Sequence, residues 1–159
     1  MTTPSSAGRQ CIVVALDGSP LAETALPKAL MLAKLPAAEV ILLHVIASIQ
    51  NVIEDSEPIT IDEQWDSAKR GGLRYLESIC TRLEWRDLNV RVAVEMGPPA
   101  DTIVDFARAQ AAEWIVLSTH GRSGVRRWVY GSVADKVLHA ARTTVVLVRA
   151  GWPAADASE

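Results

Sequence analysis

The chain has 159 residues, of which 49% are hydrophobic, a size and composition typical of one globular domain with a substantial buried core. Its 16 basic and 19 acidic residues are interspersed and give a net charge of −3, so we expect neither nucleic acid nor an anionic membrane as a partner. The first ten residues contain no apolar leader, and no segment reaches the roughly 18 apolar residues of a membrane span, so we expect a cytoplasmic protein.

The first half of the chain alternates apolar runs with helical periodicity. Cys11–Leu16 is an almost unbroken apolar run, which predicts a strand covered on both faces. Leu21–Lys34 has helical spacing, and Pro27 inside it predicts a kink near residues 23–27. A second buried strand is expected over Val40–Ile46, followed by a long helix over Ile61–Leu83.

The second half continues the alternation. In Asn89–Glu95, valines at every second position alternate with residues that include Arg91 and Glu95, which predicts a strand near a sheet edge. A helix is expected over Ala100–Ala111, a buried strand over Trp114–Leu117, a helix over Val133–Ala141 and a last buried strand over Val145–Val148.

Strands that alternate with helices predict an α/β fold. Right-handed crossovers would turn this order into a doubly wound five-stranded parallel sheet, strand order 3-2-1-4-5, with helices on both faces. We expect one domain over residues 9–149, with flexible tails at 1–8 and 150–159, because both ends are polar or rich in small residues. Cys11 and Cys80 lack metal-site spacing and are interpreted as small buried hydrophobic residues.

Ligands of such sheets bind beyond the carboxyl ends of the strands. The first strand is followed by Asp17-Gly18-Ser19-Pro20, in which Ser19 is expected to cap a helix that begins at Pro20. Asp17 either contacts a ribose or a hydrated metal ion, or simply orients the turn. No dinucleotide or P-loop glycine motif occurs in the chain.

The segment after the fourth strand carries a second signal. Ser118 and Gly121 precede a nine-residue segment that ends at Gly131-Ser132, where a helix begins, and such a turn can hold phosphate with backbone N–H groups. Ser132, three residues before Asp135, is also expected to be an ordinary helix N-cap in a capping box. Arg122 either neutralises phosphate charge or lies on a solvated loop face.

These features together resemble the universal stress protein family. The resemblance covers residues 9–149 and rests on Asp17, on Leu42-Leu43-His44-Val45 and on the glycine-serine block. The ATP-binding branch of that family carries a G-x-x-G, nine-residue, G-[S/T] pattern. Ser118 replaces its first glycine, which adds a Cβ atom and disfavours a positive φ angle.

The resemblance implies a site for ATP with Mg²⁺ or Mn²⁺. Ala15 and Asp17 would line the adenosine end, with Asp17 as an indirect metal ligand, and Val45 would offer backbone groups to adenine. The remaining positions implied for base, ribose and phosphates are Leu117, Ser118, Gly121, Gly131, Ser132 and Val133. His44 is expected to be a satisfied histidine of the core or rim.

Two function classes remain. The first is an ATP-binding regulatory universal stress protein, which acts in stress response through nucleotide-dependent interaction with an unknown protein partner. The second is a dimeric interaction module of the same fold that binds no nucleotide. No acid-base or nucleophile constellation predicts an enzyme, so we expect at most slow ATP hydrolysis. A homodimer through the apolar segment Thr143–Arg149 is expected in either case.

Overall fold

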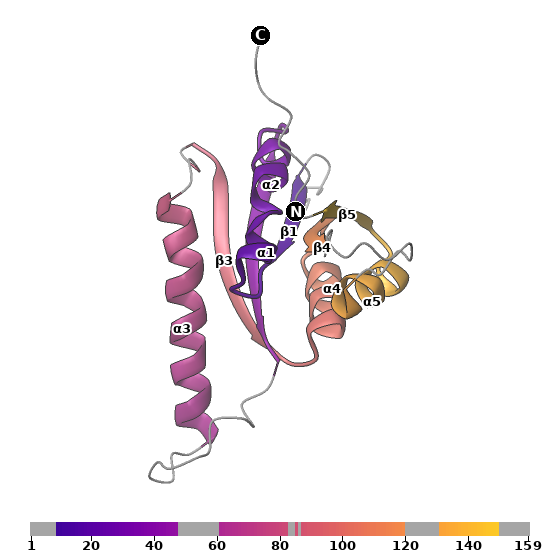
Figure 1. Cartoon of the computed structure of the whole chain (residues 1–159). Coiled ribbons are helices and arrows are strands. Elements are labelled where there is room, and N and C mark those ends of the chain that lie inside the picture. The colour runs from indigo at the N-terminus through magenta and orange to yellow at the C-terminus, as the bar shows by residue number, and fades with distance from the viewer. Residues whose placement is uncertain (1–8, 48–60, 83–84, 86, 120–130, 150–159) are drawn as a thin grey trace, which may run out of the picture.

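The computed structural model describes residues 9–47, 61–82, 85, 87–119 and 131–149. They form a single α/β domain around a five-stranded parallel sheet in the order β3-β2-β1-β4-β5 (Figure 1). The strands are β1 (Gln10–Ala15), β2 (Ala38–Ile46), β3 (Asn89–Met96), β4 (Trp114–Thr119) and β5 (Thr144–Arg149). Both the fold class and the predicted strand order are confirmed.

Helices cover both faces of the sheet. This cover is required because the apolar side chains of β1 point alternately to the two faces. Ile12 and Val14, both fully buried, pack in a core with one helical layer, and Cys11 and Val13 pack in a core with the other. Figure 1 shows α3 and the pair α4 and α5 on opposite sides of the sheet. The first layer consists of α1 (Pro20–Glu23), α2 (Leu26–Leu32) and α3 (Ile61–Arg82), and the second of α4 (Pro99–Ala109) and α5 (Ser132–Ala140).

The first helical pattern is two helices rather than one kinked helix. Between the two helices the backbone makes hydrogen bonds of the 3₁₀ type. Thr24 N donates to Leu21 O and Ala25 N donates to Ala22 O, each to the residue three positions earlier. Pro27 lies in the first turn of α2, where its missing N–H costs no intrahelical bond. The break therefore falls near the predicted residues, but it separates α1 from α2.

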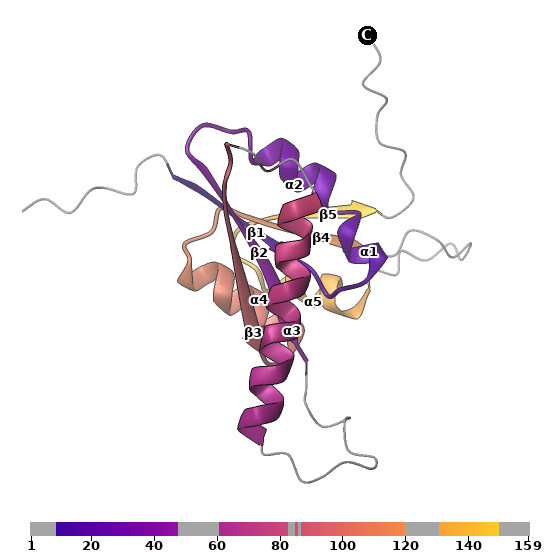
Figure 2. The same ribbon diagram turned by 90° about the vertical axis from the view of Figure 1, so that its left-hand side faces the viewer.

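The sheet has β3 and β5 at its edges, so the edge prediction for the third strand is confirmed. Cys11 is buried as expected, whereas Cys80 is only half-buried on α3. Figure 2 shows α3 running along the sheet and extending past its end, and the buried residues of α3, Gly72, Leu76 and Ile79, all lie in its second half. Within the described ranges, no helix has both the length and the apolar character of a membrane span.

Candidate functional site

A pocket of about 570 Å³ opens at the carboxyl edge of the sheet. It lies where β1 separates β2 from β4, the position at which chain order reverses and at which α/β sheets bind ligands. Every predicted site residue within the described ranges lines it, namely Ala15, Asp17, Val45, Leu117, Ser118, Gly131, Ser132 and Val133. Gly121 and Arg122 lie outside the described residues.

The turn after β1 forms one wall of the pocket. Gly18 has φ +87°, a conformation that favours glycine, and Asp17 Oδ1 accepts a hydrogen bond from Ser19 N at 2.9 Å. Ser19 Oγ in turn accepts from Ala22 N at 3.1 Å, which confirms Ser19 as the N-cap of α1. Asp17 thus orients the turn, and its exposed carboxylate also borders the pocket.

The start of α5 forms another part of the lining. Gly131, with φ −55° and ψ 147°, is the N-cap, no side chain among the described residues is seen to cap this end, and Asp135 N donates to Gly131 O at 2.9 Å. The predicted capping box is therefore wrong, because Ser132 is already the first helical residue and only the residue before it has cap geometry. The backbone N–H groups of Ser132 and Val133 have no intrahelical acceptor, and a helix end of this kind favours an anion.

Ser118 has a strand conformation at the end of β4, where it pairs with Val148 of β5. The described non-glycine residues with positive φ are Ala37, Asp87 and Ala111, so the expected conformational conflict at Ser118 does not arise. Serine in place of the motif's first glycine adds a Cβ atom at the pocket wall without straining the backbone.

Several lining residues were not among the predicted site residues. Pro99 and Ile103 of α4 add an apolar wall, and the Gly97-Pro98-Pro99 turn that ends β3 at this sheet edge is the sequence signal for them. His44 also lines the pocket, and its Nδ1 lies 2.9 Å from Leu16 O. The interpretation of His44 as a satisfied histidine is confirmed.

Asp17 is the carboxylate among the described residues that line the pocket. No cluster of three or more carboxylate, histidine or cysteine side chains that could hold a metal ion occurs among the residues that the structure describes. Asp17 is a single carboxylate that already accepts one backbone hydrogen bond. Such a residue can contact a hydrated metal ion held mainly by phosphates.

Solved structures show the same fold. The protein MJ0577 of Methanocaldococcus jannaschii superimposes with a TM-score of 0.72 at 26% identity, over 91% of this chain and 98% of that one. A universal stress protein solved in complex with cAMP gives a TM-score of 0.66 at 20% identity, over 90% and 98% of the two chains. One from Archaeoglobus fulgidus in complex with dAMP gives 0.56 at 24% identity, over 87% and 96%.

Sequence comparison agrees with the structural similarity. The universal stress protein YxiE of Bacillus subtilis is 30% identical over 145 residues, which cover 87% of this chain and 97% of that protein. The model of the universal stress protein family matches residues 8–149, which include all the described strands and helices. This chain therefore belongs to the universal stress protein family.

Proposed function

We propose that this protein binds ATP, together with Mg²⁺ or Mn²⁺, in the pocket at the carboxyl edge of the sheet. The observation that carries the proposal is that one pocket joins an apolar wall to a helix N-terminus. Ala15, Val45 and Leu117 line it on one side, and Gly131 and Ser132 line it at the start of α5. A volume of about 570 Å³ is in the range of small-molecule sites. The apolar wall suits a nucleobase, and the helix N-terminus suits phosphates.

The nucleotide would lie across the edge of the sheet. Its base would contact the apolar wall that includes Ile103, and its ribose would lie beside Asp17 and Ser118. The phosphates would extend toward the N–H groups of Ser132 and Val133, with Gly121 and Arg122 as further proposed contacts. The divalent cation would be held by the phosphates and would contact Asp17 through water. The complexes of related folds with cAMP and dAMP support an adenine nucleotide.

The proposed role is regulatory: the bound nucleotide would alter how the protein contacts a protein partner during stress.

We also propose that the protein is a homodimer through Thr143–Arg149, whether or not a nucleotide is bound. This proposal is supported by the edge position of β5 in the described sheet and by its half-buried residues Val145, Val146, Leu147 and Val148, because an apolar strand at a sheet edge favours pairing with another chain.

The second candidate is a dimeric module that binds no nucleotide. One observation favours it, namely the side chain of Ser118 where the ATP-binding pattern has glycine, at the wall of the pocket. The two candidates predict opposite results for ligand binding, so one experiment separates them.

The deciding experiment is mass spectrometry of the gently purified native protein, followed by calorimetric titration of the ligand-free protein with ATP and Mg²⁺. We expect a co-purified adenine nucleotide and one binding site per chain. Absence of a bound nucleotide together with no heat at millimolar ATP would favour the second candidate. Titration with GTP and CTP in the same buffer tests whether the pocket selects the base.

A further inference from the structure

The ladder between β1 and β2 ends in an irregular way at the pocket. Leu16 N donates to Leu43 O at 2.9 Å, which continues the regular parallel pairing of Ala15 with Leu43. In a parallel ladder the next hydrogen bond would run from Val45 N to Leu16 O, because alternate residues of β2 direct both backbone groups toward β1.

A side chain takes the place of that hydrogen bond. His44 Nδ1 lies 2.9 Å from Leu16 O, and among the described residues no backbone hydrogen bond joins Val45 N to this oxygen. A carbonyl oxygen only accepts, so Nδ1 carries the hydrogen and donates it. The carbonyl that would have extended the ladder therefore accepts its hydrogen bond from His44.

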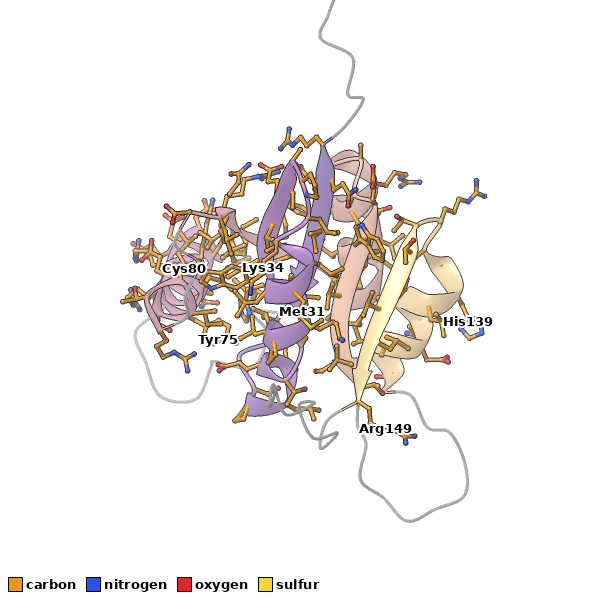
Figure 3. The ribbon with its side chains drawn as sticks, turned by 90° about the horizontal axis from the view of Figure 1, so that it is seen from above. Met31, Lys34, Tyr75, Cys80, His139 and Arg149 are labelled. Atoms are coloured by element: carbon orange, nitrogen blue, oxygen red, sulfur yellow. The ribbon has the colours of Figure 1, made fainter. Side chains whose placement is uncertain are left out.

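The imidazole ring is held in place from α3. Tyr75 meets it edge to face, with ring centroids 5.7 Å apart and an interplanar angle of 64°, and Gly72 leaves room for it on the same helix. Figure 3 shows Tyr75 and His139 on opposite sides of the domain, so this support comes from the layer of α3, away from α5. His44 thus bridges α3 and the turn after β1.

The hydrogen bond from His44 to Leu16 O affects Val45, which lines the pocket. Its N–H and C=O are directed to the side on which β1 has ended, and no backbone hydrogen bond among the described residues joins its N–H to Leu16 O. We propose that His44 is a positioning residue for the nucleobase: by acting as the donor to Leu16 O in place of Val45 N, it keeps the Val45 N–H available to an acceptor nitrogen of a purine. This inference rests on the proposed function.

Two substitutions separate the hydrogen bond from the ring. His44→Asn keeps an N–H donor at the position of Nδ1 and removes the ring, whereas His44→Phe keeps a ring and removes the donor. We expect the phenylalanine variant to bind ATP about tenfold more weakly, the order of effect of one lost hydrogen bond, and the asparagine variant to stay within about threefold of wild type. Inorganic tripolyphosphate, which lacks a base, should bind all three proteins alike.

A second readout needs no ligand. NMR hydrogen exchange of the Val45 amide should show little protection in the wild type and in His44→Asn. It should show clear protection in His44→Phe, where Leu16 O is released to accept from Val45 N. A thermal melt of each variant confirms that it is folded.

The outcomes distinguish the two proposals. Wild-type protein that binds no adenine nucleotide overturns the proposed function, and the base-positioning role with it. Wild-type protein that binds ATP, with the phenylalanine variant binding equally well and its Val45 amide equally unprotected, overturns the role of His44 alone. A loss of affinity that extends equally to tripolyphosphate would show a general structural effect and would also overturn it.

Discussion

Gly72 of α3 lies so close to His44 of β2 that a Cβ atom added to it would stand 2.9 Å from His44 Cδ2. The same atom would lie 3.1 and 3.2 Å from the two methyl groups of Val94. Because Val94 is buried in the core of the sheet, it has little freedom to move away. The missing side chain of Gly72 is therefore what allows α3 to approach the sheet at this point.

Gly72→Ala should destabilise the fold by about 1 to 3 kcal/mol, because overpacking outweighs the gain in helix propensity of up to about 1 kcal/mol. Urea denaturation measures the difference. Gly71→Ala is the matched control, since among the described residues its added Cβ would meet only the end of Arg74 at 4.0 Å, and we expect it to be neutral or stabilising. Equal stability of the two variants would contradict the contact.

Gly131→Val should remove the ATP-dependent rise in melting temperature. Binding to the native state alone stabilises by about 2.7 kcal/mol at 100 times the dissociation constant, which shifts the melt by several degrees. The φ of −55° and ψ of 147° at Gly131 are open to ordinary residues, so the unliganded variant should fold, although valine is a poorer N-cap than glycine and should lower its melting temperature slightly. A normal ATP shift in this variant would argue against phosphates at the start of α5.

Ser118→Gly should preserve or strengthen the same ATP shift. Ser118 lies in a strand and lines the pocket, so glycine removes a side chain from the cavity without being needed for the backbone conformation. Thermal melts with and without ATP, each compared with the unliganded variant, separate the effect on binding from the effect on stability. A weaker shift would mean that the hydroxyl of Ser118 contacts the nucleotide.

Val146→Lys should convert the proposed homodimer into monomers. Val146 is half-buried on the edge strand β5, and a charge there would lie in the proposed interface between two copies. Sedimentation at micromolar concentration measures the state, and circular dichroism checks the fold. A wild-type protein that sediments as a monomer would overturn the proposed assembly.

Any ATP hydrolysis should be slower than about one turnover per second, below the rates of typical enzymes. The chain has no P-loop lysine, and Asp17 is the proposed contact to the metal ion. Phosphate release is the measurement, with Asp17→Ala prepared in parallel. Faster release that disappears in this variant would reveal an active enzyme.

The free energy of unfolding should decrease between about pH 10 and 12 because Tyr75 ionises more readily in the unfolded chain. Burial, and next the charge of Glu23, raises the pKa of Tyr75 from 10.0 to about 12. The folded state then binds the phenolic proton where the unfolded state has lost it, so stability is full below pH 10 and falls as pH rises toward 12. Tyr75→Phe should flatten this loss, measured by denaturation at each pH, and a loss that persists unchanged in the variant would contradict the role of Tyr75.

The pattern of apolar residues by itself determined the architecture. Runs such as Cys11–Leu16 have no polar face, so they require cover on both sides, and the alternation with helices then leaves few topologies. The position of Asp17 beyond the first strand likewise followed from sequence, because the carboxyl ends of parallel strands share one edge of the sheet. The local sequence was enough to predict that Ser19 caps the helix that begins at Pro20, and the hydrogen bond of Ser19 confirms it.

Only the tertiary structure decided features that depend on which atoms meet. Ser132 has the sequence of a cap, but Gly131 has the cap geometry, and helix ends shift by a residue through contacts that no local pattern records. Ser118 needs no glycine conformation, because pairing with Val148 holds it extended. The hydrogen bond from His44 to Leu16 joins residues 28 positions apart, and it exists because strand register brings a side chain to a carbonyl that the ladder would otherwise use.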